Sequence, residues 1–279
     1  MKGRLAALNL PGIGNQSIRK AEVKNEIFSD DFSIWCEQVG MAWSNNYGVF
    51  TRQKAWDLAS RQMETIKKLG GEILCPEGSF YPEVFSELSN PPLLISVLGD
   101  SSLLKRRGLA IIGSRKPSEF AKNRSYLLGR ECAKEDRVAV SGLALGCDTL
   151  AHWGALSVKG KTIAVLPSDL SRIVPQKNAR LARQIVEGQG LLLSEVFPEI
   201  KLEPYHFVQR NRLIAALSEW ILVVQAEKAS GSMHTVRMGR KLNRKIGVAL
   251  CEGDCMGEGC QWIVDQSWGC SFCHLKNIL

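Results

Sequence analysis

Apolar and polar positions follow two different rhythms along this chain. Within residues 1–70, apolar side chains recur every three or four positions, which is the spacing of an amphipathic helix. In the clearest example, charged residues separate the members of an apolar stripe made of Trp56, Ala59, Met63 and Ile66. Between two such patterns, Pro11-Gly12-Ile13-Gly14 has the form of a helix-hairpin-helix turn. Such a turn either presents N–H groups to a DNA phosphate or only connects two packed helices.

Beyond a Pro-containing connector that begins at Gly70-Gly71, short apolar runs alternate with helical patterns. The run at 94–98 is expected to form an edge strand. Further strands are predicted at 109–112, 138–141, 162–166, 191–194, 220–224 and 246–249. Helices are predicted at 119–134, 147–157, 178–187, 210–217 and 233–242.

This alternation predicts an α/β fold in which a buried parallel sheet carries helices on both faces. The expected domains are a helical unit at 1–70, the sheet domain at 71–250 and a Cys-rich tail at 251–279.

Composition adds few constraints. The chain has 279 residues, 45% of them hydrophobic, which is enough for a large core. A net charge of +8 suits a polyanionic partner without proving one. No long uncharged apolar stretch predicts a membrane span, and Asn9 and Pro11 interrupt the apolar start too early for a secretory signal. We therefore expect a cytoplasmic protein.

Four short segments rich in Gly, Ser or Arg lie close behind apolar runs. Ligands of open α/β sheets bind beyond the carboxyl ends of the strands, so we expect these segments to meet at one edge. Small residues, hydroxyls and guanidinium groups together favour a phosphorylated ligand. Lys177 and Asn178, just before a predicted helix, are further candidate contacts. The four segments supply the main candidates, which are Gly113, Ser114, Arg115, Ser141, Gly142, Gly146, Arg210, Asn211, Arg212, Ser230, Gly231 and Ser232.

Each segment also has a structural interpretation. A Ser or Asp near a helix start is commonly a cap. Asp148 and His152 lie on one face of a predicted helix, and such a His is usually a packed core residue. The two arginines Arg210 and Arg212 need either an anion or nearby acids, for which Glu195, Glu199 and Glu203 are available. We favour phosphate, because a guanidinium group binds phosphate with two parallel hydrogen bonds.

Several catalytic motifs are missing from the sequence. There is no Gly-x-x-x-x-Gly-Lys-Ser/Thr loop and no Gly-x-Gly-x-x-Gly after the first strand of the sheet domain, which disfavours P-loop hydrolysis and hydride transfer. No nucleophile is paired with a matched base. We therefore expect a protein that is not an enzyme and needs no organic cofactor.

Taken together, these motifs resemble the DNA-processing protein A family, also called DprA or Smf. The resemblance rests on Ile-Ile-Gly-Ser-Arg at 111–115, Ser-Gly-Leu-Ala-x-Gly-x-Asp-x-x-Ala-His at 141–152, Arg-Asn-Arg-Leu-Ile at 210–214 and Ser-Gly-Ser at 230–232. It implies an extended Rossmann-like parallel sheet preceded by a small helix-hairpin-helix or SAM-like domain. It also implies a homodimer that binds single-stranded DNA, loads the RecA recombinase and protects incoming DNA during transformation. By motif position, the main candidates named above would line the DNA pocket.

Departures from the family pattern weigh most against recombinase loading. Pro-Ser-Asp-Leu stands at 167–170 where the family has a Gly-rich turn, and the tail is too short for the winged-helix module of some relatives. A second hypothesis is a nucleotide sensor or a phosphoribohydrolase-like enzyme. Those enzymes carry an acid after their Gly-rich loop, and the matching stretch at 230–237 has none. A third hypothesis is a protein-interaction module.

Five of the nine cysteines lie within 251–279. Cys270-x-x-Cys273 has the spacing of zinc ligands, and Cys255 and Cys260 would complete a four-ligand site. The alternative is a divergent tail of reduced thiols.

The zinc hypothesis predicts about one zinc ion per chain, as a single four-ligand site requires. Metal analysis of untagged protein prepared without added metal tests this, and metal-free protein would remove the idea.

Overall fold

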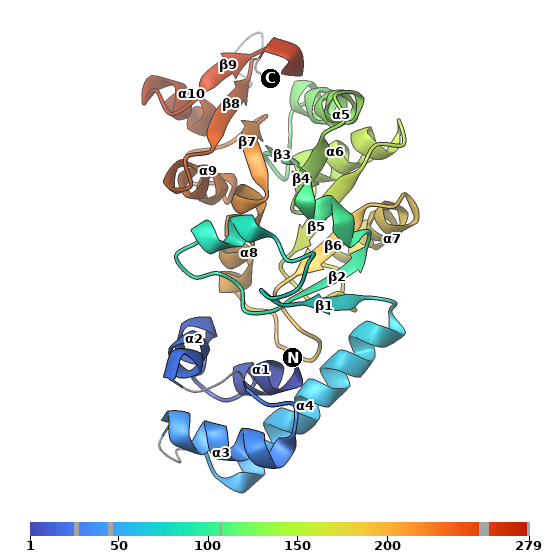
Figure 1. Cartoon of the computed structure of the whole chain (residues 1–279). Helices are drawn as coiled ribbons and strands as arrows, with labels where there is room; N and C mark the ends of the chain where they lie inside the picture. Colours follow the sequence, from blue (N-terminus) through green and yellow to red (C-terminus); the bar gives the residue numbers. More distant parts are fainter. Residues whose placement is uncertain (25–27, 44–46, 107, 251–256, 278–279) are drawn as a thin grey trace.

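The structure is a computed structural model that describes residues 1–24, 28–43, 47–106, 108–250 and 257–277. Four helices come first, α1 (Lys2–Leu8), α2 (Asn15–Lys24), α3 (Phe32–Trp43) and α4 (Val49–Lys68), and they form the lower layer in Figure 1. The predicted Pro-Gly-Ile-Gly turn connects α1 to α2, and Gly12 adopts φ +75° there. None of the described helices is long and apolar enough to cross a membrane.

The described strands form one nine-stranded sheet in the order β1-β2-β6-β5-β4-β3-β7-β8-β9. The neighbouring strands β6, β5, β4, β3, β7, β8 and β9 run parallel to one another. Strand β2 runs antiparallel to β6, and β1 runs antiparallel to β2. The strands are β1 (Glu72–Leu74), β2 (Ile95–Gly99), β3 (Gly108–Ile112), β4 (Val138–Ser141), β5 (Thr162–Leu166), β6 (Leu191–Ser194), β7 (Ser218–Val223), β8 (Lys245–Ala249) and β9 (Cys270–Phe272).

The predicted α/β class is confirmed, and the strands expected in the sheet domain lie within two residues of their predicted positions. The edge assignment for 94–98 is wrong. This segment forms β2, which is second in the sheet because β1 covers its outer side.

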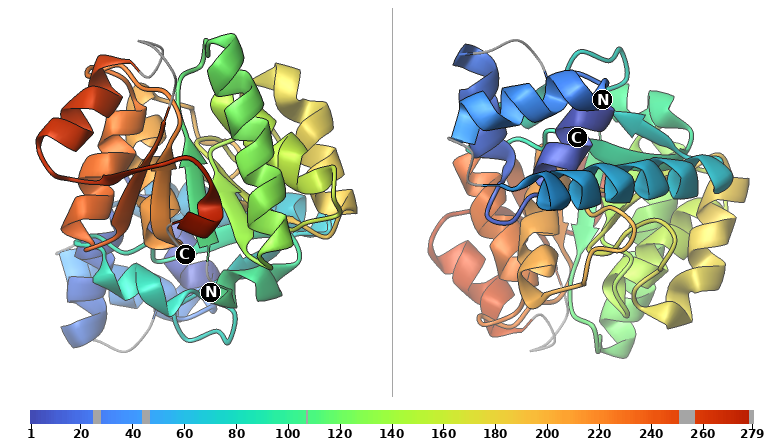
Figure 2. Two further views of the ribbon diagram at one scale, coloured as in Figure 1. Left: turned by 90° about the horizontal axis from the view of Figure 1, so that it is seen from above. Right: turned by 90° about the horizontal axis from the view of Figure 1, so that it is seen from below.

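Helices cover both faces of the sheet. They are α5 (Glu119–Lys134), α6 (Cys147–Leu156), α7 (Ala179–Glu187), α8 (Pro204–Ala216), α9 (Ser232–Lys241) and α10 (Glu258–Asp265). On β3, Ala110 and Ile112 pack toward α8 and α9, whereas Leu109 and Ile111 pack toward α5 and α6. Figure 2 shows the two helical layers with the sheet between them. Burial on both sides explains why the strands are continuously apolar.

Helix α8 begins at Pro204, six residues before the predicted start. Glu203 caps the helix by accepting the His206 N–H, and the His206 ring accepts the Glu203 N–H at 2.9 Å. Pro204 occupies the first helical position, where its missing N–H costs nothing. Consequently the Arg-Asn-Arg segment at 210–212 lies in the middle of a helix, whereas the sequence analysis placed it at a helix start.

The described part of the tail completes the sheet. Strand β9 pairs in parallel with β8, and Phe272 is buried beneath α5. Residues 257–277 therefore belong to the sheet domain and do not form a separate unit. A three-residue Cys-Ser-Phe strand has too few alternating positions to be recognised from sequence.

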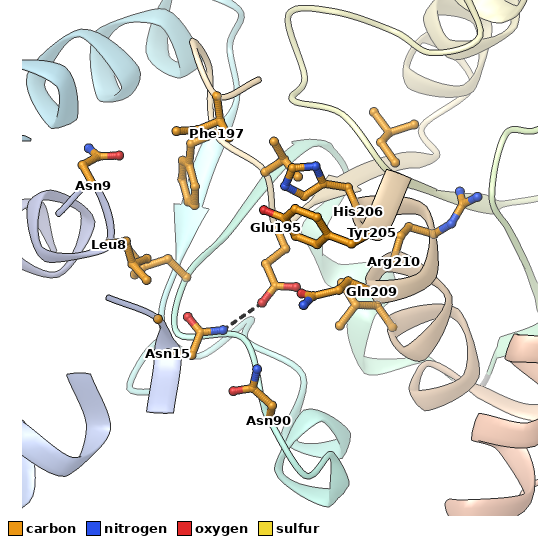
Figure 3. Close-up of a pocket in the computed structure, with 16 residues that line it drawn as sticks. Leu8, Asn9, Asn15, Asn90, Glu195, Phe197, Tyr205, His206, Gln209 and Arg210 are labelled. Carbon is orange, nitrogen blue, oxygen red and sulfur yellow. Dashed lines mark hydrogen bonds between the residues drawn. The ribbon is translucent and has the colours of Figure 1, made fainter. Parts of the chain in front are cut away.

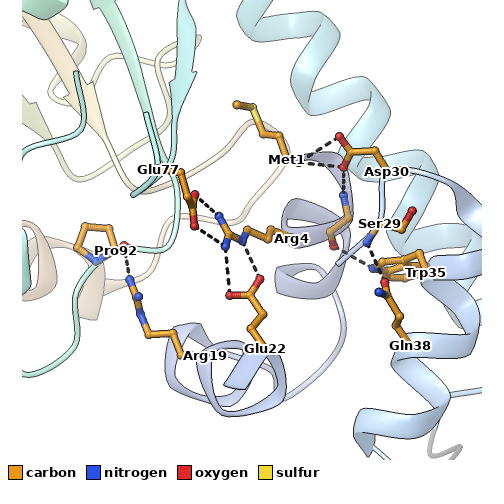
Figure 4. Close-up of polar contacts among 11 residues, drawn as sticks. Met1, Arg4, Arg19, Glu22, Ser29, Asp30, Trp35, Gln38, Glu77 and Pro92 are labelled. Atoms are coloured by element: carbon orange, nitrogen blue, oxygen red, sulfur yellow. Dashed lines mark hydrogen bonds and ion pairs between the residues drawn. The ribbon is translucent and has the colours of Figure 1, made fainter. Parts of the chain in front are cut away.

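The helical unit and the sheet domain share one apolar cluster, in which Trp35 and Trp56 lie with Leu93, Leu94 and Phe197. Ion pairs of Arg4 reinforce this contact (Figure 4). The buried Arg4 guanidinium donates to Glu22 on α2 at 2.7 Å and to Glu77, beyond β1, at 2.6 Å.

Replacing Arg4 with Ala should lower the free energy of unfolding by about 3 kcal/mol, the low end for breaking a buried ion pair, because Glu77 is half exposed. Urea denaturation measures this. Arg61→Ala is the matched control, since Arg61 also joins the helical unit to the sheet domain but pairs with Glu199 at an exposed position. An equal loss of unfolding free energy in both variants would contradict the stabilising role assigned to the buried Arg4 pair.

The same pair has a pH signature. The hydrogen bond from Arg4 lowers the pKa of Glu77 from 4.5 to about 2. Because the folded-state pKa is depressed, this stabilisation is complete above the ordinary pKa and is lost as the pH falls toward 2. The Arg4→Ala variant should lack this contribution in acid unfolding curves.

Candidate functional site

A cavity of about 390 Å³ opens at the carboxyl ends of β3 and β7. The strand order reverses here. Strands β4, β5 and β6 extend the sheet on one side of β3, whereas β7, β8 and β9 extend it on the other side. Such a switch point is the usual ligand site of an open α/β sheet. We call it the switch-point cavity.

The structure brings all four predicted segments to this cavity, the segment at 141–146 through Ala144 alone. Its lining includes eight of the predicted site residues, namely Gly113, Ser114, Arg115, Arg210, Asn211, Ser230, Gly231 and Ser232. They come from the end of β3, from the middle of α8 and from the start of α9. Ser141, Gly142, Gly146, Lys177, Asn178 and Arg212 lie outside the lining.

Arg115 is the cation that the cavity offers to a ligand. Its side chain is exposed, and its guanidinium carbon lies 5.8 Å from the centroid of the Phe207 ring on α8. Among the residues that the structure describes, Arg115 forms no ion pair. A guanidinium group above an aromatic ring suits both a phosphate and a stacked base.

Ser230 and the start of α9 add neutral groups that bind anions. The buried Ser230 hydroxyl has no hydrogen-bond partner within the described part of the chain. Helix α9 has ten residues, and its positive dipole end lies at the cavity. Asn211 donates to the Gly231 carbonyl at 3.2 Å and Ser232 to the Gly113 carbonyl at 2.9 Å, so these side chains hold the walls together.

Gly113 lines the cavity and also has a packing role. A Cβ atom at this position would lie 2.5 Å from the sulfur of Cys147, so α6 already occupies that space. Gly146 is required for a different reason, because it precedes α6 with φ +82°.

Arg210 is a buried cation held by protein groups, and its contact with phosphate stays a prediction. Its Nη1 atom donates to the carbonyls of Gly142 and Val165, and its Nε atom donates to Asn211 at 3.0 Å. Burial lowers its pKa to about 10, so it remains charged at neutral pH. Asp148, whose own pKa is raised by burial, accepts the Gly142 N–H at 3.0 Å and opposes this charge.

Arg212 is also held by protein groups. It is buried and pairs at 2.5 Å with Glu195, one of the acids named in the structural alternative, and its contact with phosphate stays a prediction. Ser141 donates to the Ile111 carbonyl at 2.6 Å, and Asn178 donates to the Leu143 carbonyl at 2.8 Å. Lys177 lies exposed beside Asn178, away from the switch-point cavity.

His152 is a buried core residue, which agrees with the structural interpretation of the sequence. Its Nδ1 atom lies 2.7 Å from the Thr162 hydroxyl, and burial lowers its pKa to about 3, which keeps the ring neutral.

Sequence reasoning missed Glu227 and His234, which line the cavity on either side of Ser230. The Ser230 N–H donates to the Glu227 carbonyl in a turn, so a turn prediction at this point would have placed Glu227 nearby. Phe207 of α8 also lines the cavity. It precedes Asn211 by four positions, which is one helical turn, but the predicted helix began too late to show this.

The zinc hypothesis stays a prediction. Among the described residues, no three His, Cys, Asp or Glu side chains are grouped closely enough to hold a metal ion. Cys260 is buried in α10, Cys270 and Cys273 are exposed, and Cys255 lies outside the described residues.

A family model described as DNA recombination-mediator protein A matches residues 72–279. This chain belongs to that family. The DNA processing protein DprA of Bacillus subtilis is 36% identical over 167 residues, which cover 60% of this chain and 56% of that protein. The DprA of Streptococcus pneumoniae is 35% identical over 190 residues, 67% of this chain and 66% of that protein. The matches thus span between about half and two thirds of these relatives.

Solved structures of two relatives share the fold. The DprA of Streptococcus pneumoniae superposes with a TM-score of 0.81 at 26% identity, covering 100% of this chain and 96% of that one. DNA processing protein A of Helicobacter pylori was studied for its single-stranded DNA binding mode. It superposes with a TM-score of 0.68 at 32% identity, covering 74% of this chain and 93% of that one. The extended Rossmann-like architecture expected from the sequence is therefore confirmed.

The two arginines of the switch-point cavity should respond differently to substitution. Arg210→Gln should lower the free energy of unfolding by about 3–5 kcal/mol, because it leaves Asp148 buried without its opposing charge. Arg115→Gln should leave stability within about 0.5 kcal/mol, because the side chain is exposed. Thermal and urea unfolding of both variants test this, and a stable Arg210→Gln protein would show that the buried guanidinium is dispensable.

Proposed function

We propose that this chain binds single-stranded DNA in the switch-point cavity and acts as a recombination mediator without catalysing a reaction. The observation that carries this proposal is the meeting of Arg115, Phe207 and Ser230 at one cavity, although they come from three separate parts of the chain. Family membership and the DNA-binding study of the Helicobacter pylori relative support it.

The chemistry of the cavity suits a single strand better than a duplex. Nonspecific single-strand binding combines cationic contacts to the backbone with aromatic stacking of bases, and Arg115 with Phe207 supplies both. A concave site of this volume accepts an unstacked base, whereas bases in a duplex face one another. The contacts available from Arg115, Ser230 and α9 address phosphate, so binding should not depend on sequence.

Family membership also supports the finer parts of the proposal. These are a homodimer that loads the RecA recombinase and protects incoming DNA. The Pro-Ser-Asp-Leu turn at 167–170 and the partial coverage of the relatives make these the first parts to test separately.

A nucleotide sensor or phosphoribohydrolase-like enzyme is the second candidate, and one observation favours it. Glu227, three residues before Ser230, is an acid in the cavity lining, although the stretch at 230–237 has none. Calorimetry with a panel of nucleotides, run beside an oligonucleotide of about 20 bases, the span of one or two binding sites, separates the two functions.

Arg115→Ala should weaken binding of a labelled single strand about ten-fold, equally for different sequences, and should reduce the salt dependence by about one phosphate contact. Fluorescence anisotropy at two salt concentrations, with duplex of the same sequence alongside, measures both effects. Lys134→Ala is the control, because Lys134 is an exposed cation in the last turn of α5 and outside the cavity. Salt-independent binding, or equal affinity of both variants and the wild type, would count against the proposal.

A further inference from the structure

A second cavity, of about 270 Å³, lies between the helical unit and the sheet domain. We call it the inter-domain cavity. Figure 3 shows Asn15 of α2, Asn90 of the connector, and Tyr205 and Gln209 of α8 gathered around the Glu195 carboxylate. Its volume falls just below the range of about 300–1,000 Å³ for drug-sized ligands, so it suits a group about the size of one nucleobase.

The polar groups of this cavity favour a neutral ligand with N–H donors. The buried Oδ1 atom of Asn90 has no hydrogen-bond partner among the described residues, and such an acceptor marks a place for a donor. The Glu195 carboxylate is already held by Arg212 at 2.5 Å and by Asn15 at 2.9 Å, so its charge is matched. A phosphate would meet this carboxylate without a free cation to offset it.

Two further titratable groups in the lining, His206 and Arg210, agree with this selection. Burial lowers the pKa of His206, so its ring is neutral at physiological pH. Arg210 also lines the cavity, but its guanidinium donates to the carbonyls of Gly142 and Val165. The inter-domain cavity therefore differs from the switch-point cavity, where Arg115 is available.

An exposed aromatic ring lies at this cavity. Tyr205 is 54% exposed, and its ring centroid lies 4.1 Å from that of His206. An exposed ring beside a small, mainly apolar cavity that also holds a few polar groups can serve as a stacking platform for a base.

The two cavities lie on opposite sides of α8. Phe207, Asn211 and Ile214 face the switch-point cavity, whereas Tyr205, Gln209 and Leu213 face the inter-domain cavity. A helix with its side chains is about 10–12 Å across, so a single strand that crosses it reaches both sides within a few nucleotides. Val208, which is 48% exposed, lines the switch-point cavity and adds an apolar surface there.

We propose that the inter-domain cavity is a second subsite, which takes a nucleobase of the same single strand that binds at Arg115. This inference rests on the proposed function. Tyr205 stacks on the base, and the Asn90 amide oxygen accepts a hydrogen bond from its edge. The helical unit thereby takes part in holding the strand.

The test compares Tyr205→Ala with the wild type on oligothymidylates of about 4 and about 16 nucleotides, the limits of one compact binding site. The variant should bind the long oligonucleotide at least about five-fold more weakly, the lower end for loss of one stacked base, and the short one with unchanged affinity. Phe50→Ala is the matched control, because Phe50 is an aromatic residue of α4 that is 72% exposed and outside both cavities. This control should bind both oligonucleotides as the wild type does.

A second measurement identifies the contact itself. Removing one base at a time from the long oligonucleotide should reveal a position whose loss weakens the wild type but does not weaken Tyr205→Ala further. Two outcomes would overturn the subsite and leave the proposed function intact. One is an additive loss of affinity at every base position, and the other is an equal loss of affinity for the short oligonucleotide. Wild-type protein that binds neither oligonucleotide would refute the proposed function and the subsite together.

Discussion

The buried guanidinium of Arg210 holds the helix on which both cavities depend. It joins α8 to the carbonyls of Gly142 and Val165, which lie at the carboxyl ends of β4 and β5. This buried charge is tolerated because its N–H groups are hydrogen-bonded and Asp148 supplies a nearby acidic group. Since α8 is also the crossover from β6 to β7, this contact fixes the place where the strand order reverses. Two stripes of the helix then line two different cavities.

This arrangement separates structural cations from cations available to a ligand. Arg4, Arg210 and Arg212 are buried and engaged with acids or carbonyls, whereas Arg115 is exposed above an aromatic ring. In the proposed DNA site, contacts to phosphate therefore rest on few of the side chains that the structure describes. Much of each motif serves instead to bring the loops together, as Gly113 does against Cys147.

Most of the fold was predictable because its physical causes are local. Strands buried on both faces are continuous apolar runs, and amphipathic helices repeat every three or four residues. The short strands β1 and β9 carry too little pattern, and the start of α8 depends on a Glu–Pro–x–His cap that was not recognised. The meeting of the loops followed from the geometry of parallel strands. Which arginine remains free did not, because Glu195 is 17 positions from Arg212 and only tertiary packing brings them together.

The most direct test of this account is a crystal structure with a short oligothymidylate bound. The account predicts a phosphate oxygen within hydrogen-bond distance of the Arg115 guanidinium or the Ser230 hydroxyl, with a base against Phe207. A strand bound on another face, with the switch-point cavity holding only water, would contradict it.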